Sequence, residues 1–221
     1  MAIGNYEVNA DCYIPPLKLS SGVYKDNILE LYTHAKFYMM AWNKLIKKDF
    51  LLKNNLYFKE GIIHEDDLWS FCCSCKLRKI SVIQQKTYLY RFRYDSIQRG
   101  TDYEKHYQNY CEVAKGMMEY VLNNEESNNT LSFLFIRMQL HCLMLSPFYN
   151  QHSELTKSFY KSLIKSHFWS IKEIVRFPNI IFSLMFYLRN VFSLRLIYPC
   201  FIRLYLRRYD TGNTWFSKFF V

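Results

Sequence analysis

The sequence predicts a mixed α/β fold, on two observations. Apolar residues recur at three- and four-residue steps over residues 26–50, which is typical of a helix that buries one face. Two short segments, 79–83 and 87–92, are instead rich in β-branched and aromatic residues, as strands are. Half of the 221 residues are apolar and 22% are charged. A chain of this size and composition can therefore bury a substantial core.

The residue types within and beside each segment predict the elements of the first 76 residues. A strand is expected over residues 11–14, because two consecutive prolines follow and prolines cannot donate to a sheet. After the helix over 26–50, residues 50–58 predict a short helical turn and an extended piece. A further helix is expected from the acidic run at Glu65 to Lys76, since carboxylates in a first turn are stabilised by the helix dipole.

The later elements follow the two strands at 79–83 and 87–92. A helix is expected over 102–122, and the polar loop NNEESNNT at 123–130 is the best internal boundary. We therefore expect a first domain over residues 1–122 and a second over 131–221. The second is expected to be helical, with one helix over 131–145 and two or three more over 151–208.

The positive charge is concentrated in this second part. Residues 151–221 hold 11 Lys or Arg against three acidic residues, and so carry +8 of the net charge of +10. Arginines alternate with apolar residues over 175–208, a pattern typical of a basic amphipathic helix at a membrane interface. A helical subdomain packed on the core remains the alternative. Nucleic acid is not favoured as a partner, because no recognition motif accompanies the charge.

Cysteine usage and the N-terminal sequence favour a cytoplasmic protein. Seven cysteines, an odd number, indicate free thiols in a reducing compartment. No signal peptide is evident, and the longest uncharged apolar stretch, over 177–188, is shorter than the roughly 20 residues that span a bilayer. The run CCSC at 72–75 contains a CxxC, but no second ligand pair follows to complete a zinc site. We expect no metal site from these residues.

The sharpest candidate site is the acidic run Glu65, Asp66 and Asp67. Adjacent carboxylates repel one another unless a helix terminus, a cation or a hydrogen-bonding ligand stabilises them. One of them could serve as a general base. All three could equally be residues of an ordinary acidic helix start.

Three separated motifs place this run in a wider pattern. The first is Trp42, Asn43, Lys44 and Leu45. The second contains Phe58, Glu60, Gly61, His64, Glu65, Asp66 and Asp67. The third contains Tyr88, Tyr90, Arg91, Ser96 and Ile97. In this order and spacing, the motifs resemble the acceptor-side half of a family 2 glycosyltransferase of the GT-A type. The resemblance covers residues 1 to about 115.

The resemblance implies a partial GT-A, Rossmann-like core followed by an α-helical C-terminal extension. It implies inverting transfer of a sugar from a nucleotide-diphosphate donor to a glycan or lipid-linked acceptor in bacterial cell-surface polysaccharide synthesis. Asp66 would then be the catalytic base, with Glu65 beside it. Substrate-binding roles would fall to a further set of residues: Trp42, Asn43, Lys44, His64, Asp67, Trp69, Arg91 and Ser96.

Four of these binding residues also have a structural interpretation. The two tryptophans, Trp42 and Trp69, could stack on a sugar ring or could belong to the core. Lys44 and Arg91 could neutralise a diphosphate or could simply be solvated surface residues. These alternatives stay open at the level of sequence.

The donor side of the family's pattern is missing from the sequence. Such enzymes hold a divalent cation, Mg²⁺ or Mn²⁺, through an Asp-x-Asp motif, and this chain contains none. We expect a truncated enzyme, one half of a split enzyme, or a degenerate remnant. The alternative function is therefore a non-catalytic or membrane-associated binding protein with a glycosyltransferase-like fold. For the enzyme, we expect a cytoplasmic location at the inner face of the plasma membrane.

Overall fold

The structure is a computed structural model, and it describes residues 1–9, 17–33, 36–91 and 103–124. The chain divides into two compact units. Met1–Asp102 and Tyr209–Val221 form one unit, and Tyr103–Arg208 form the other. All of the described strands and three of the described helices belong to the first unit.

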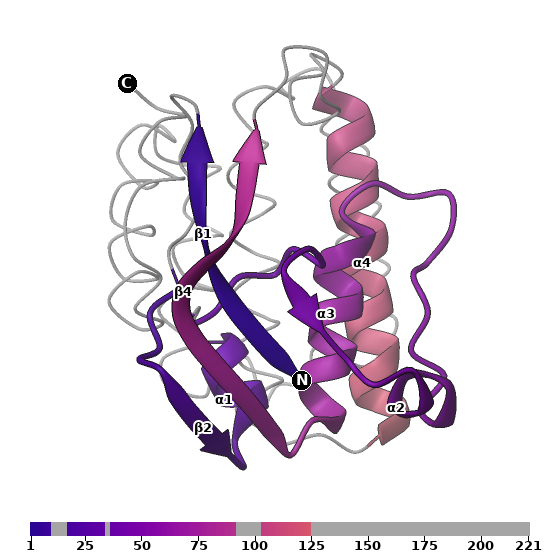
Figure 1. Ribbon diagram of the computed structural model, residues 1–221. Helices are drawn as coiled ribbons and strands as arrows, with labels where there is room; N and C mark the ends of the chain where they lie inside the picture. Colours follow the sequence, from indigo (N-terminus) through magenta and orange to yellow (C-terminus); the bar gives the residue numbers. More distant parts are fainter. Residues whose placement is uncertain (10–16, 34–35, 92–102, 125–221) are drawn as a thin grey trace, which may run out of the picture. The chain divides into compact units, whose positions relative to one another are not determined.

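A four-stranded mixed sheet is the centre of the first unit (Figure 1). In sheet order, its strands are β2 (Gly22–Lys25), β4 (Lys79–Arg91), β1 (Ala2–Asn9) and β3 (Lys44–Leu45). The long strand β4 runs parallel to β1 and antiparallel to β2, and β3 pairs antiparallel with β1. The register between β1 and β4 shifts on both sides of Asn5. Residues of β4 therefore bulge where they pass this part of β1.

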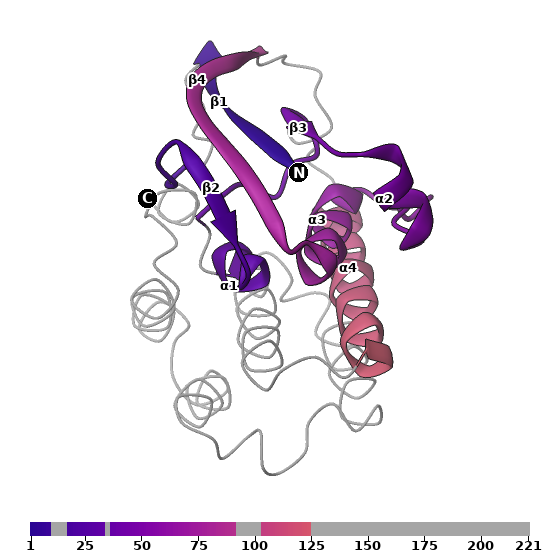
Figure 2. The same ribbon diagram turned by 60° about the horizontal axis from the view of Figure 1, so that its bottom comes forward.

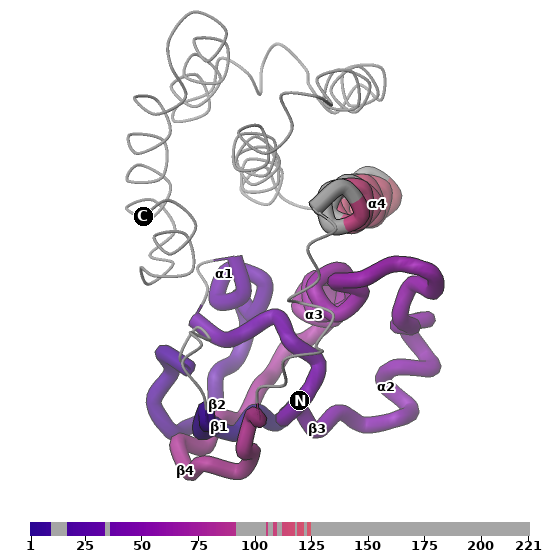
Figure 3. The backbone as a smooth tube through the Cα atoms, turned by 90° about the horizontal axis from the view of Figure 1, so that it is seen from above, coloured from indigo at the N-terminus to yellow at the C-terminus, as the bar shows by residue number. Residues whose placement is uncertain are grey.

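Two helices of this unit have six residues each, and the third has 12. They are α1 (Ile28–Thr33), α2 (Lys48–Lys53) and α3 (Glu65–Lys76). Helices α1 and α3 lie over the same face of the sheet, whereas α2 lies beyond the edge strand β3 (Figure 3). The core between sheet and helices contains side chains with at most 1% exposure: Ile3, Ile28, Phe71 and Ile80.

The second unit is described over one helix, α4 (Tyr103–Asn124). Its buried residues Asn109, Val113, Ala114, Met117 and Val121 recur at steps of one, three or four, as expected for one face of an amphipathic helix. No described helix in either unit combines the length and hydrophobicity needed to cross a bilayer.

Several sequence expectations are confirmed. The helix expected to begin at Glu65 is α3, and the helix expected over 102–122 is α4 within two residues at either end. The segments 79–83 and 87–92 are strand up to Arg91, but they form one continuous strand rather than two. The residues that separate them coincide with the shift in register against β1.

The helix expected over 26–50 is wrong for residues 36–47, which separate α1 from α2. The chain from residue 36 onward turns toward the sheet, where Asn43 takes a left-handed conformation (φ 60°) and Lys44 begins β3. The apolar rings of Tyr38 and Trp42, whose spacing suggested a helix, pack instead on Tyr6 of β1. Tertiary packing of large aromatic rings thus overrides the helical pattern.

The first strand of the sheet was not expected from the sequence. The segment of β1, AIGNYEVN, has only two β-branched residues, Ile3 and Val8, although polar and apolar residues alternate over 5–9. The strand that was expected, over 11–14, lies outside the described residues, as do the helices expected after residue 131 and most of the boundary at 123–130. What the structure shows is a mixed α/β architecture.

Candidate functional site

The three adjacent carboxylates lie in the first turn of α3. Two left-handed residues, Gly61 (φ 78°) and His64 (φ 67°), turn the chain into this helix. The N–H of Asp67 donates to the carbonyl of His64 at 3.1 Å, which closes the first turn. The acidic side chains therefore stand at the positive end of the helix dipole, where their charge is favoured.

The carboxylates differ in what surrounds them. The side chain of Asp67 is fully buried, and its Oδ1 accepts a 2.5 Å hydrogen bond from the hydroxyl of Tyr32. The same hydroxyl lies 3.1 Å from the main-chain oxygen of Asp67. Glu65 and Asp66 are only half-buried. Asp67 thus ties α3 to α1, and the other two carboxylates remain partly open to solvent.

The ammonium group of Lys44 lies between the segment before β3 and helix α3. Its Nζ donates to the carbonyl oxygens of Met39 (3.1 Å) and Met40 (2.6 Å) and to Ser70 Oγ of α3 (2.9 Å). It also lies over two aromatic rings, 5.3 Å from the centroid of Tyr38 and 5.9 Å from that of Phe37. Lys44 is therefore an internal cation bound on several sides, not a solvated surface residue.

Asp66 and Lys44 influence each other's protonation. Burial and, after it, the charges of Asp67 and Glu65 together raise the pKa of Asp66 to about 6, against the opposing effect of Lys44. Burial lowers the pKa of Lys44 to about 7, and the nearby carboxylates oppose that shift, Asp66 first among them. At neutral pH the Asp66 carboxylate is mostly ionised and close to its pKa, which suits a group that accepts a proton.

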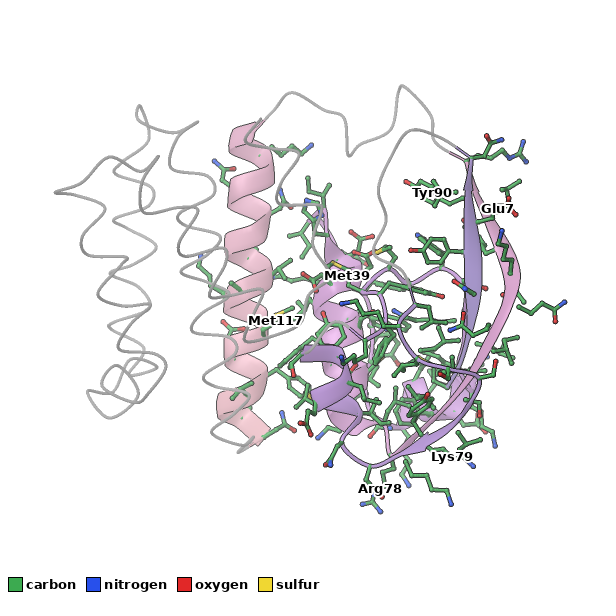
Figure 4. All side chains as sticks on the ribbon, turned by 90° about the vertical axis from the view of Figure 1, so that its left-hand side faces the viewer. Glu7, Met39, Arg78, Lys79, Tyr90 and Met117 are labelled. Atoms are coloured by element: carbon green, nitrogen blue, oxygen red, sulfur yellow. The ribbon has the colours of Figure 1, made fainter. Side chains whose placement is uncertain are left out.

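A cluster of aromatic rings forms next to Lys44 around Trp42. The indole of Trp42 is nearly parallel to Tyr88 (4.8 Å, 11°) and to Tyr38 (5.0 Å, 23°), and it meets Tyr6 edge-on at 5.1 Å. Tyr90 lies 5.5 Å from it and projects from β4 toward the face of the sheet that carries α3 (Figure 4). Of these five rings, Tyr88 is the most exposed, at 39%.

Asn43 joins the segment before β3 to the two central strands. Its Nδ2 donates to the carbonyls of Gly4 and Asn5, both at 2.9 Å, and its Oδ1 accepts from the hydroxyl of Thr87 at 2.8 Å. All of its amide atoms are thereby used within the protein. The arrangement gives Asn43 a structural role at the point where β1 and β4 shift register.

The remaining candidate residues lie in different environments. Trp69 is buried, donates from Nε1 to the carbonyl of Leu56, and is stacked at 4.8 Å with Phe58, which is 46% exposed. Arg91 is exposed at the end of β4. Ser96 lies outside the described residues, as does the basic segment 175–208. Among the described candidates, the structure thus brings Lys44, Asp66 and Asp67 together and does not unite them with Arg91.

The cysteines of α3 are free thiols. Burial raises the pKa of both Cys72 and Cys73 to about 12, so that both stay protonated at neutral pH. Within the described residues, no group of three or more His, Cys, Asp or Glu side chains is arranged to hold a metal ion.

Sequence reasoning did not find two residues that complete this arrangement: Tyr32, which binds Asp67, and Ser70, which binds Lys44. Tyr88, which is stacked on Trp42, was named only as part of the third motif and not as a site residue. Ser70 lies three residues after Asp67, on the same side of the helix, and this spacing was the available signal. Comparison of the chain with models of known protein families and with curated proteins found no match.

Proposed function

We propose that this chain is the acceptor-binding part of a sugar transferase, with Asp66 as its general base. The observation that carries the proposal is a half-buried carboxylate, Asp66, whose pKa is raised to about 6 and on which the charge of the hydrogen-bonded Lys44 acts. The order of the three motifs, which resembles that of family 2 glycosyltransferases, supplies the reaction type.

In the proposed reaction, an acceptor hydroxyl attacks the anomeric carbon of a nucleotide-diphosphate sugar. Asp66 takes the hydroxyl proton as the new carbon–oxygen bond forms. The bond from the anomeric carbon to the diphosphate breaks, and the nucleoside diphosphate leaves with its electron pair. Attack from the face opposite the leaving group inverts the anomeric carbon. A positioned carboxylate of this kind accelerates such a step by about 10²- to 10⁴-fold.

Asp66 suits the role of base better than its neighbours do. Asp67 is fully buried and bound by Tyr32, which leaves it unable to meet a substrate hydroxyl. Glu65 is half-buried, and we assign it a secondary role beside the base. Lys44 lowers the pKa of Asp66 against the larger effect of burial, and the resulting pKa of about 6 leaves Asp66 mostly ionised at neutral pH.

The acceptor is proposed to be a glycan, since an exposed aromatic ring with an apolar face suits a sugar. Tyr88 presents such a ring at the outer part of the Trp42 cluster. The donor, and the Mg²⁺ or Mn²⁺ that members of the family bind with it, need ligands that the sequence does not supply as Asp-x-Asp. We propose that a donor-binding half acts together with this chain. We further propose a cytoplasmic location at the inner membrane surface.

The test is a transfer assay with the full chain. UDP-glucose, UDP-galactose, UDP-N-acetylglucosamine and GDP-mannose are supplied with Mn²⁺ and an extract of source cells that lack the wild-type chain, which provides the glycolipids and the donor-binding half. Release of nucleoside diphosphate is measured. Asp66→Asn is expected to lower turnover at least 100-fold. The matched control is Asp49→Asn, which changes an exposed aspartate in the first turn of α2 and is expected to keep full turnover.

Two results would decide against the proposal. Full turnover by Asp66→Asn would remove the assignment of the base. Saturable binding of glycan by the wild-type chain, without turnover on any donor and with no effect of Asp66→Asn on affinity, would favour the alternative of a non-catalytic binding protein.

A further inference from the structure

An exposed surface that is both apolar and basic surrounds α2. Its apolar residues are unusually open to solvent: Leu45 is 78% exposed, Tyr57 65%, Leu52 47% and Phe58 46%. Exposed lysines lie among them, at positions 47, 48, 53 and 59. We call these eight residues the α2 surface. None of the residues of α2 itself is buried.

Charge on this surface is predominantly positive. Over residues 45–60 the four lysines are opposed by two exposed acidic residues, Asp49 and Glu60. The resulting charge of +2 is combined with four exposed apolar side chains on one short segment. A soluble protein usually scatters such apolar side chains singly, and a group of them marks a surface that meets a partner.

The surface lies at one side of the first unit. Helix α2 is next to the edge strand β3, at the opposite side of the sheet from β2 (Figure 2). The segment is nevertheless fixed to the core, because Leu56 is buried and its carbonyl accepts from Trp69 Nε1 at 3.2 Å. Phe58 is stacked on the same indole. The exposed side chains are therefore held on an anchored segment.

We propose that the α2 surface binds the face of a lipid bilayer with anionic headgroups. Leucine and aromatic side chains enter the boundary between headgroups and acyl chains, and lysines beside them pair with anionic headgroups. The positive charge favours a bilayer over an apolar site on a second copy of this chain, which would bring like charges together. The segment 175–208 takes no part in the argument, and neither does the activity of Asp66.

Geometry connects this surface with the candidate site. Trp69, on which Phe58 is stacked, belongs to the same helix as Asp66, three residues further on. Lys44 and Leu45 are consecutive residues of β3, the first bound to Ser70 of α3 and the second exposed on the α2 surface. A bilayer bound at α2 would lie next to the elements that hold Asp66.

The experiment measures binding of the full chain to vesicles by co-sedimentation. Vesicles of phosphatidylcholine alone are compared with vesicles that contain 30% phosphatidylglycerol. Because each lysine near an anionic surface contributes roughly fivefold to partitioning, the variant Lys47→Gln, Lys48→Gln, Lys53→Gln is expected to bind the anionic vesicles at least tenfold less. The double variant Leu52→Ser, Tyr57→Ser is expected to bind less to both kinds of vesicle.

A matched control removes the same charge elsewhere. Lys25→Gln, Lys79→Gln, Lys86→Gln changes three exposed lysines of β2 and β4, and it is expected to change binding less than threefold. Hydrogen exchange adds a local measurement: amides over residues 45–60 are expected to exchange more slowly when anionic vesicles are present. Asp66→Asn is expected to leave vesicle binding unchanged. Vesicle binding therefore tests the membrane surface independently of the proposed reaction.

Three results would overturn the proposal. The first is exchange over residues 45–60 that anionic vesicles do not alter. The second is equal loss of binding in the two triple-lysine variants, which would show attraction by net charge alone. The third is loss of self-association in Leu52→Ser, Tyr57→Ser with unchanged vesicle binding, which would assign the surface to a second copy.

Discussion

Ser70 accepts a 2.9 Å hydrogen bond from Lys44 Nζ and donates its own proton to the carbonyl oxygen of Met39. The hydroxyl thus connects a helix, α3, to the segment that leads into β3. Lys44 binds the same carbonyl directly. This small network holds a partly buried ammonium group whose charge acts on the carboxylate of Asp66.

Lys44→Met is expected to alter how stability depends on pH. The folded-state pKa of Lys44, about 7, is below its ordinary value of 10.5, so the unfolded chain binds more protons between these values. The free energy of unfolding therefore rises with pH in this window, by up to about 1.4 kcal/mol per pH unit. Urea unfolding at pH 7 and pH 9 should show a smaller rise in Lys44→Met than in the wild type. Lys48→Met, at an exposed position, should keep the wild-type rise.

Asp66→Asn is expected to stabilise the fold at high pH while it abolishes transfer. The folded-state pKa of Asp66, about 6, is above its ordinary 3.8, so the stability that its protonated form contributes is present below pH 3.8 and lost as pH rises through 6. Asparagine avoids the cost of the buried charge, and we expect a gain of about 1 kcal/mol at pH 8 after allowance for partial exposure and for Lys44. No gain is expected at pH 4. Urea unfolding at both pH values measures the difference, and an equal gain at both would contradict the explanation.

Asn43→Asp is expected to lower the free energy of unfolding by about 2–4 kcal/mol. The change replaces the amide that donates to the carbonyls of Gly4 and Asn5 with a carboxylate that faces them. Thermal and urea unfolding check the loss. Asn55→Asp is the control, because Asn55 is also left-handed (φ 52°) but exposed. A similar loss at both positions would indicate that backbone conformation, not the amide's hydrogen bonds, is responsible.

Gly4→Ala is expected to destabilise the sheet by about 1–3 kcal/mol, as overpacking does. A Cβ atom at Gly4 would lie 1.9 Å from Thr87 Oγ1, so the side chain of Thr87 must move and its bond to Asn43 is strained. Thr87→Ala removes the hydroxyl. In a double-mutant cycle, Gly4→Ala should therefore cost less in the Thr87→Ala background, and equal costs would show that the contact is not the cause.

The parts of the fold that were predicted from sequence are those set by local chemistry. The acidic run at Glu65 indicated the start of α3 because carboxylates suit a helix N-terminus, and the β-branched and aromatic residues before Arg91 indicated β4. The role of these acidic residues in a site stays a prediction. Sequence alone could not tell which of them is buried.

The parts that were missed depend on contacts between distant segments. β1 forms because Ile3 and Tyr6 pack against elements far along the chain, although its glycine, asparagine, alanine and glutamate residues have low strand propensity. The helix expected over 26–50 ends early because Tyr38 donates to the carbonyl of Gly4 and because Asn43 binds both central strands. The assignment of Lys44 to an internal network required Ser70, which lies 26 residues away.

The cluster around Trp42 has an optical consequence. An indole held nearly parallel to two phenol rings within about 5 Å couples electronically with both of them, and such coupling gives a strong circular dichroism signal in the near ultraviolet. Tyr38 precedes β3, Trp42 adjoins it, and Tyr88 belongs to β4, so the signal arises only when these segments have come together. The protein therefore carries its own spectroscopic reporter of sheet assembly, and no external label is needed to follow its folding.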